Sequence, residues 1–175
     1  MIKFEKVSRL KNVEFDMPTR KTKYSAGYDM VVAEDFIVPP YRELYEKFDS
    51  IVLGAISLDG LEAMTKEKKL RPSLVPTGVK CYLDPGYYLE LSLRSSTPLK
   101  YWLVMANSQG IIDADYADNE SNEGEIFFQL INLSPYPISL KRGDVIGQGI
   151  IKKYNLTDDD CAEGERTGGF GSTNG

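Results

Sequence analysis

The chain has 175 residues, of which 42% are hydrophobic and 27% charged, a composition typical of one globular domain with its own core. Its 21 basic and 26 acidic residues give a net charge of −5, which argues against broad binding to a nucleic-acid backbone, so no nucleic-acid partner is expected. The sequence contains no His, so Ser-His and Cys-His nucleophilic pairs are excluded and carboxylates remain the plausible general bases.

Membrane, secretion and disulfide signals are absent from the sequence. No apolar run is long enough to cross a bilayer, and residues 1–6 lack the apolar core of a signal peptide, so a cytoplasmic protein with no membrane partner is expected. Cys81 and Cys161 are too few and too far apart for a disulfide framework or a zinc site. Both are predicted to be free thiols.

The first 40 residues predict short β-strands, over residues 2–7, 25–33 and 34–38. In the second of these, Gly27 permits a tight backbone and Asp29 stands at the mouth of the strand. The alternative for Asp29 is a turn cap that hydrogen bonds to nearby backbone.

Residues 41–74 differ from the β-rich sequence on either side. Asp59 and Glu62 have the spacing of a capping box, and apolar residues recur at helical intervals before a group of lysines. A short helix is therefore predicted over residues 59–69, with its cations near the carboxyl end, where the helix dipole favours them.

Strand and turn signals return after residue 72, with a strand edge, a turn and a strand over 75–80, a turn over 84–86 and a strand over 87–93. Arg94, Ser95 and Ser96 follow directly at the strand end. A guanidinium beside hydroxyl groups suits phosphate oxygens, and the alternative is a helix N-cap with an incidental surface Arg.

A β-hairpin is predicted next, with a strand over 102–106, a turn over 107–110 and a return strand ending near residue 116. Such a hairpin would hold backbone donors and acceptors beside Asn107, Asp113 and Tyr116. These groups suit the reading of a small planar heterocycle and chemistry next to it. The alternative is an ordinary acidic hairpin with one exposed Tyr.

Further strands are predicted over 125–133, 138–140 and 145–151, the last two joined by a tight turn over 141–144. Gln148 places an amide within the last, otherwise apolar strand. The alternative is that this amide only hydrogen bonds to a neighbouring backbone group. Many short strands with Gly and Pro turns favour an antiparallel sandwich or barrel.

The glycine-rich segment 165–175 has the composition of a frayed tail. Its Arg, hydroxyl groups and backbone N–H groups around Phe170 also suit a flexible lid that closes over a phosphate chain and stacks its ring on a base.

Five segments resemble, in the same order, the five motifs of the trimeric dUTP pyrophosphatases (dUTPases). They are residues 26–29 (AGYD), 94–96 (RSS), 110–116 (GIIDADY), 143–148 (GDVIGQ) and 166–173 (RTGGFGST). Each motif alone is weak evidence, but five in order across most of the chain are highly specific.

The resemblance implies a mainly β, jelly-roll (distorted β-barrel) subunit over residues 1–160 and a flexible carboxy-terminal arm over 161–175 that closes over the active site. It also implies a homotrimer whose active sites are shared between neighbours. Residues 41–74 are a short helical insertion relative to compact members of the family. A packed surface element is expected there, and a regulatory or protein-binding surface is the alternative.

The implied reaction is hydrolysis of dUTP to dUMP and pyrophosphate, which keeps uracil out of DNA and supplies the precursor of thymidylate. By motif match, Asp113 is the base that orients and deprotonates the water attacking the α-phosphorus. An Asp is ionised near neutral pH unless it is buried without a partner. The implied cofactor is Mg²⁺, held by the triphosphate and waters without a direct protein ligand.

The resemblance also implies the substrate contacts. Asn107 and the backbone at Gly110 and Ile112 would read the uracil edge, and Tyr116 would lie under the deoxyribose and exclude a 2′-hydroxyl. Phe170 would stack on uracil. The residues expected at the phosphates or within the arm motif around them are Arg94, Ser95, Ser96, Gln148, Arg166, Gly171, Ser172 and Thr173. Asp29 would support the site indirectly.

Besides the insertion over 41–74, the chain departs from the family pattern at two places. The fifth motif has one residue fewer than usual between Arg166 and Phe170, and residues 117–124 are longer and more polar than the usual short Gly turn. Two rival functions follow from the same fold. A dCTP deaminase would need a proton-shuttling Glu near the hairpin, where no such motif stands, and the intact Asp113 and Phe170 argue against a non-catalytic regulatory homologue.

Overall fold

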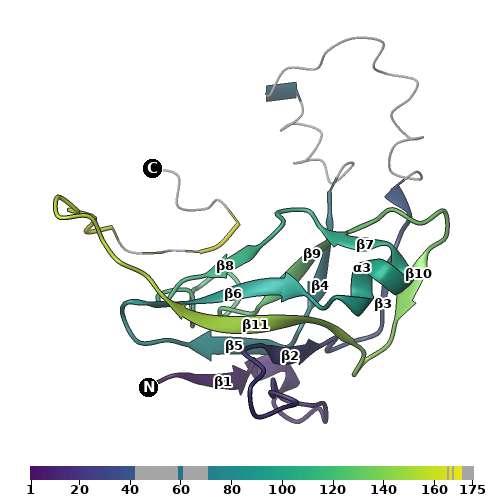
Figure 1. Ribbon diagram of the computed structural model, residues 1–175, viewed down its shortest axis with the longest axis horizontal. Coiled ribbons are helices and arrows are strands. Elements are labelled where there is room, and N and C mark those ends of the chain that lie inside the picture. The colour runs from purple at the N-terminus through teal and green to yellow at the C-terminus, as the bar shows by residue number, and fades with distance from the viewer. Residues whose placement is uncertain (42–58, 61–70, 165, 167, 171–175) are drawn as a thin grey trace.

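The computed structural model describes residues 1–41, 59–60, 71–164, 166 and 168–170 (Figure 1). Its two larger sheets are antiparallel. The four-stranded sheet has the order β2 (Tyr28–Val31), β11 (Val145–Lys153), β6 (Tyr87–Leu93) and β8 (Gly110–Ile112). The three-stranded sheet has the order β4 (Ser73–Pro76), β9 (Phe127–Asn132) and β7 (Leu103–Met105).

Smaller elements complete the body of the molecule. Two antiparallel ribbons pair β1 (Lys3–Lys6) with β5 (Val79–Tyr82) and β10 (Ile138–Leu140) with β3 (Phe36–Val38). The helical elements include the 3₁₀ turn η1 (Ser8–Leu10) and the helix α3 (Ser96–Tyr101). The mainly β fold predicted from the many short strands is confirmed.

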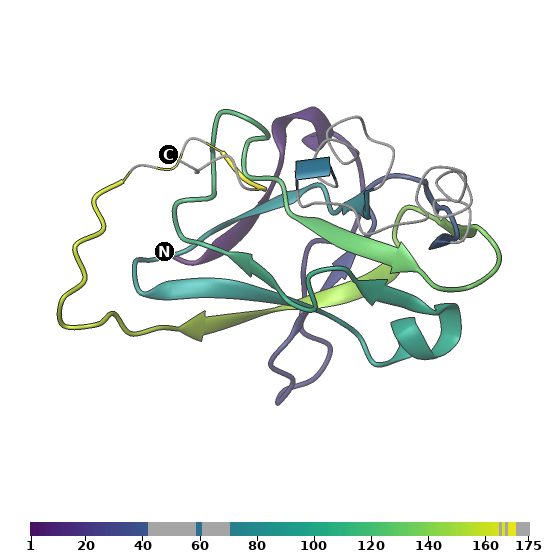
Figure 2. The same cartoon turned by 90° about the horizontal axis from the view of Figure 1, so that it is seen from above.

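The two larger sheets share one apolar core (Figure 2). Met30, Leu89 and Leu91 of the four-stranded sheet are almost fully buried, as are Leu103 and Phe128 of the three-stranded sheet. Full burial of one such side chain stabilises the fold by about 1.5–3 kcal/mol. This shared core fixes the sheets, and through them the strand ends that carry the predicted motifs.

Strand β6 coincides with the predicted span 87–93, but its centre does not alternate between buried and exposed residues. Glu90 is buried together with Leu89 and Leu91 on either side of it. The reason is a tertiary contact, because Lys152 of the neighbouring strand β11 donates to Glu90 Oε1 at 2.6 Å. A charged residue at this position is buried because it is paired.

The predicted hairpin over 102–116 is wrong, although both of its strands exist. Strand β7 pairs with β9 in one sheet, whereas β8 pairs with β6 in the other. The turn between them therefore connects two sheets, with Ser108 in the left-handed region at φ +55°. Turn signals identified the bend, but they do not specify which distant strand pairs with each arm.

The structure describes only part of the predicted insertion over residues 41–74. Asp59 and Gly60 are helical, and the remainder of the helix predicted over 59–69 lies outside the described residues. Strand β4 already begins at Ser73, within the segment expected as insertion.

Cys81 and Cys161 are both free thiols, as predicted. In the described residues, no helix has the length and apolar character that crossing a bilayer would require.

Candidate active site

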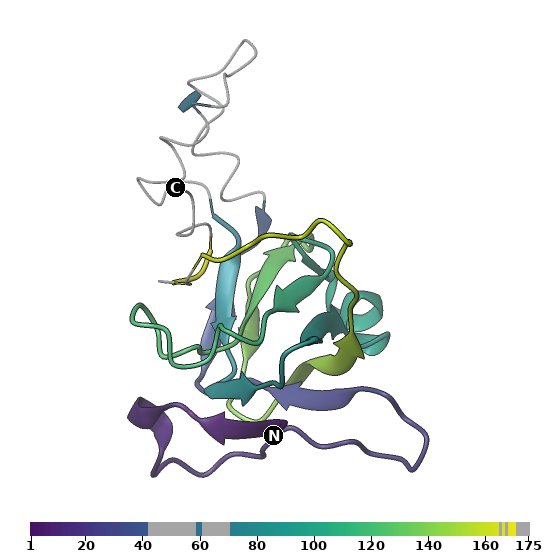
Figure 3. The same cartoon turned by 90° about the vertical axis from the view of Figure 1, so that its left-hand side faces the viewer.

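A pocket of about 210 Å³ opens beside strand β8. The carboxy-terminal arm, after leaving β11, returns across the sheets (Figure 3). Six residues predicted from the sequence line the pocket together: Asn107, Gly110, Ile112, Tyr116, Arg166 and Phe170. Phe127 and Gln129 of β9 also line it, and sequence reasoning missed them. Their strand was predicted, but the face that meets the arm is set by packing between sheets.

Strand β8 is the last strand in its sheet, paired on one side with β6. An edge strand leaves the backbone N–H and C=O groups of its outer side available to another molecule. Gly110 and Ile112 both line the pocket. The backbone donors and acceptors expected at this position are therefore present, although they come from a sheet edge and not from a hairpin.

Two carboxylates and one guanidinium stand at the rim of this pocket. Arg166 Nε donates to Asp115 Oδ1 at 2.7 Å, and Arg166 Nη2 donates to Asp113 Oδ2. The Arg166 guanidinium also lies 5.9 Å from the centroid of the Tyr116 ring. Partial burial lowers the pKa of Arg166, but the hydrogen bond and charge of Asp115 outweigh this effect, so its pKa lies above the ordinary value.

Asp115 is a site residue that sequence reasoning did not select. The signal was its position two residues after Asp113 within the third motif. In the structure both side chains are about half exposed, with relative accessibilities of 49% for Asp113 and 58% for Asp115. Arg166 thus binds the predicted base and its neighbour at once.

Tyr116 is almost fully buried, with 6% of its surface exposed, so the alternative of an exposed Tyr is wrong. Its hydroxyl donates to the Glu125 carbonyl oxygen at 3.1 Å. Gly169 packs against the ring, because a Cβ at that position would stand 2.6 Å from Tyr116 Cε2. Phe170 is 56% exposed and lies 6.1 Å from the Phe127 ring in an edge arrangement, so it offers an open aromatic face.

The second motif lies at the carboxyl end of β6. Ser95 directly precedes helix α3, but its side chain makes no capping hydrogen bond, so the N-cap alternative is not supported. Arg94 Nη1 lies 3.5 Å from Asp29 Oδ2. Asp29 sits within strand β2 and is buried, and its Oδ2 has no hydrogen-bond partner among the described residues. Asp29 is therefore positioned to hold the Arg94 guanidinium, which is the indirect support predicted for it.

Gln148 joins this second group from strand β11. It is in register with Asp29 on one side and Ser92 on the other, and its Nε2 donates to Ser92 Oγ at 3.4 Å. The Gly27 backbone approaches so closely that a Cβ there would overlap the Gln148 amide. Glycine in the first motif is thus required by contact with the fourth motif.

The predicted site residues form two separate clusters in one chain. The pocket cluster contains Asn107, Gly110, Ile112, Asp113, Tyr116, Arg166 and Phe170, and the phosphate cluster contains Asp29, Arg94, Ser95, Ser96 and Gln148. No member of the phosphate cluster lines the pocket. Leu91 does line it, and Arg94 lies three residues further along, about 10 Å at the rise of a β-strand. Gly171, Ser172 and Thr173 lie outside the described residues.

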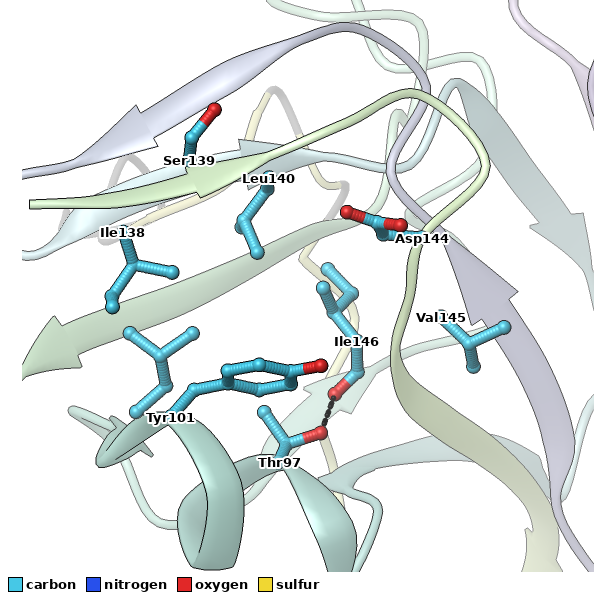
Figure 4. Close-up of a pocket in the computed structure, with 9 residues that line it drawn as sticks. Thr97, Tyr101, Ile138, Ser139, Leu140, Asp144, Val145 and Ile146 are labelled. Atoms are coloured by element: carbon cyan, nitrogen blue, oxygen red, sulfur yellow. Dashed lines mark hydrogen bonds between the residues drawn. The ribbon is translucent and has the colours of Figure 1, made fainter.

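Another pocket, of about 160 Å³, lies between α3, β10 and β11 (Figure 4). Tyr101 and Leu140 form apolar walls, and the Thr97 hydroxyl donates to the Ile146 carbonyl oxygen at 2.9 Å. None of the residues predicted to bind substrate lines this pocket. The site is therefore assigned to the pocket beside β8.

The chain is thus a mainly β protein with a pocket that brings aromatic rings and a guanidinium together beside a carboxylate. The family model for dUTPase matches residues 60–174. A deoxyuridine 5′-triphosphate nucleotidohydrolase of Lactococcus lactis is 36% identical over 172 residues, which cover 97% of this chain and 95% of its own. One of Wolinella succinogenes is 29% identical and covers 90% of this chain and 85% of its own.

Solved structures agree with these relatives. A dUTPase from Streptococcus mutans is similar, with a TM-score of 0.66 and 33% identity over 89% of this chain and 98% of its own. A dUTPase from phage phi11 of S. aureus shares the fold, with a TM-score of 0.62 and 18% identity over 94% of this chain and 97% of its own. The chain belongs to the dUTPase family.

Proposed function

We propose that this protein is a dUTP diphosphatase that hydrolyses dUTP to dUMP and pyrophosphate in cytoplasmic deoxynucleotide metabolism and so helps to exclude uracil from DNA. The observation that carries the proposal is the rim of the β8 pocket. There Asp113 stands beside an exposed strand edge, aromatic rings and a cationic arm residue. These are the groups that a pyrimidine triphosphate and an attacking water require.

The pocket cluster would bind the nucleoside. Asn107 and the β8 backbone would pair with the uracil edge, where the amino group of cytosine would meet a donor instead of an acceptor. Phe170 would stack its open face on the base, and the Tyr116 ring would lie under the deoxyribose. A site that reads a base edge by hydrogen bonds rejects analogues because their groups leave buried partners unpaired.

The chemistry would take place at Asp113. Its carboxylate would orient a water molecule and accept its proton while the oxygen attacks the α-phosphorus. The bond from the α-phosphorus to its bridging oxygen breaks, and pyrophosphate leaves. Arg166 is hydrogen bonded to Asp113. The terminal phosphate would draw Arg166 away, with Gly171, Ser172 and Thr173 beside it, and would so release Asp113 for the water.

The phosphate cluster would bind the triphosphate chain. Arg94, Ser95, Ser96 and Gln148 offer a guanidinium, hydroxyls and an amide, and Asp29 would hold Arg94 in place. Since no residue of this cluster lines the pocket of its own chain, we propose a homotrimer in which a neighbour completes each site. The segment 161–175 would act as the arm that closes it.

The Cys, Asp and Glu side chains of the described residues fit a Mg²⁺ ion that the substrate carries. In the described part of the chain, no group of three or more His, Cys, Asp or Glu side chains could hold a metal ion, and Asp113 and Asp115 are both paired with Arg166. A triphosphate and waters would therefore supply the ligands, as suits an ion that dehydrates reluctantly. A phage phi11 dUTPase of the same fold coordinates a structural Mg(II) ion. When bound, the ion would offset phosphate charge.

The test is release of pyrophosphate from dUTP, dCTP, dTTP and UTP with Mg²⁺, using the wild type and Asp113→Asn. Only dUTP should turn over quickly. Asp113→Asn should lower kcat by about 10²–10⁴-fold, the usual contribution of a general base, while calorimetry still detects nucleotide binding. Ammonia release from dCTP would indicate a deaminase. Binding of dUTP without hydrolysis by the wild type would indicate a regulatory module.

A further inference from the structure

The loop over residues 117–124, which follows Tyr116, is an ordered scaffold. Asn119 is buried, with 7% of its surface exposed, and its Nδ2 donates to the Tyr116 carbonyl oxygen at 2.8 Å. Its Oδ1 accepts from the backbone N–H groups of Ser121 at 3.0 Å and Asn122 at 3.2 Å. One side chain thus holds the loop backbone to the residue that precedes it.

Asn122 holds the other end of the Tyr116 side chain. Its Nδ2 donates to the Tyr116 hydroxyl at 2.8 Å, and its Oδ1 accepts from Gly124 N at 3.0 Å and Asn119 Nδ2 at 2.8 Å. The same hydroxyl donates to the Glu125 carbonyl oxygen. Both hydrogen-bonding functions of the phenol are therefore satisfied within the scaffold, and the ring is fixed at both ends.

The scaffold is itself tied to the body of the protein. Lys80 Nζ donates to Asp118 and, at 2.8 Å, to Glu123, and the Tyr82 hydroxyl donates to Asp118 Oδ2 at 2.8 Å. Ser8 N donates to Glu123 at 2.9 Å. Asp118 and Glu123 both have left-handed backbones, with φ near +60°. Such conformations cost free energy, and they persist only where the surroundings determine them.

Tyr116 also belongs to the site at which a ligand would bind. Tyr116 lines the β8 pocket, and Gly169 of the arm lies against the ring. A ring held between the loop and the arm cannot move back to admit a larger sugar. A rigid wall discriminates against one extra hydroxyl only if its position is fixed, since a mobile ring would yield.

We propose that Asn122 is a positioning residue that fixes the Tyr116 ring and thereby sets the discrimination between deoxyribose and ribose. The inference rests on the proposed function, because it concerns the sugar part of that site. It also gives a role to the long polar segment after Tyr116, which the family motifs do not explain. Asn122 would act only through Tyr116 and would not touch the nucleotide.

The test compares kcat/KM for dUTP and UTP in four proteins: wild type, Asn122→Ala, Tyr116→Phe and the double variant. Each single change breaks the hydrogen bond between Asn122 and the Tyr116 hydroxyl, and Tyr116→Phe also removes the bond from that hydroxyl to Glu125. Loss of the shared bond should lower the dUTP:UTP selectivity by about fivefold, the usual worth of one hydrogen bond, mainly by raising UTP turnover. The dUTP:UTP selectivity of the double variant should be no lower than that of the less selective single variant. Glu120→Ala, an exposed position in the same loop, is the matched control and should keep wild-type selectivity.

Several outcomes would overturn the inference. If Asn122→Ala lowers the melting temperature but keeps wild-type selectivity, Asn122 is only structural. If the losses in the double variant multiply, Asn122 does not act through the Tyr116 hydroxyl. If Asn122→Ala does not fold, Tyr116→Phe carries the test, and unchanged selectivity in that variant rejects the inference. A wild type that does not hydrolyse dUTP would instead reject the proposed function.

Discussion

Gly169 of the arm lies against the Tyr116 ring in the pocket. A Cβ added there would stand 2.6 Å from Tyr116 Cε2, closer than carbon atoms approach. Gly169→Ala should therefore push the arm away from the site and raise KM for dUTP by about tenfold, within the usual cost of overpacking. Steady-state kinetics with dUTP would measure this effect.

The matched control is Gly164→Ala in the same arm, where nothing lies within 4 Å of an added Cβ. That variant should keep the wild-type KM. Equal KM values for the two variants would show that the arm does not close against Tyr116 as it does in this structure.

The two cysteines differ in reactivity for a physical reason. Cys81 is buried in the core, and its burial raises the pKa of the thiol to about 12, whereas Cys161 is exposed. Since the thiolate is the nucleophile, Cys81 should stay unreactive at pH 8. We expect a thiol reagent to label one cysteine per chain in the native protein and two after unfolding. Labelling of both in the native state would contradict the buried position of Cys81.

At the scale of elements, the 117–124 loop depends on Glu123. Hydrogen bonds from Lys80, and then from the Ser8 backbone and hydroxyl, lower the pKa of Glu123 from 4.5 to about 2. Because the folded pKa lies below the unfolded value, the stabilisation is complete above about pH 4.5 and is lost as pH falls toward 2. Acid should therefore loosen the contact between this loop and strand β5.

Glu123→Gln tests this link between the loop and pH. The variant should be less stable than the wild type at neutral pH, and the difference in unfolding midpoint should shrink between about pH 4.5 and 2. Denaturant unfolding at several pH values would measure it. Glu120→Gln, exposed in the same loop, is the control and should follow the wild type. Parallel curves for Glu123→Gln and wild type would contradict the assigned contacts.

At the scale of the whole molecule, no residue of the phosphate cluster lines the pocket beside β8 in its own chain. If a neighbour supplies the phosphate cluster, an inactive Arg94→Ala subunit and an inactive Asp113→Asn subunit should rescue each other in a mixed trimer. Random exchange at equal amounts should restore about a quarter of the sites, since each site draws its two clusters independently from two kinds of chain. Pyrophosphate release after subunit exchange would measure the rescue.

The control for rescue mixes Asp113→Asn with Tyr116→Ala, both in the pocket cluster. Every site built from that mixture carries one defect, so activity should stay low. Absence of rescue in the Arg94→Ala mixture would mean that each chain completes its own site, and the shared-site proposal would fall.

The sequence by itself determined the features that depend on neighbouring residues. A period-two pattern marked the span of β6, and largely apolar runs marked β9 and β11. Turn chemistry marked the bends over 84–86 and 141–144, and the order of five motifs indicated the family. The two free thiols followed from count and spacing. These signals are local, because side-chain alternation and turn conformation are set within a few residues.

Only the tertiary structure decided which distant segments meet. The arms of the expected hairpin pair with β9 and β6, Asp29 faces Arg94, Arg166 binds Asp113 together with Asp115, and Asn122 holds Tyr116. Strand pairing and burial depend on partners that lie far along the chain, and no local pattern encodes them. Motifs therefore named most of the site residues, while packing between the sheets placed them in two clusters.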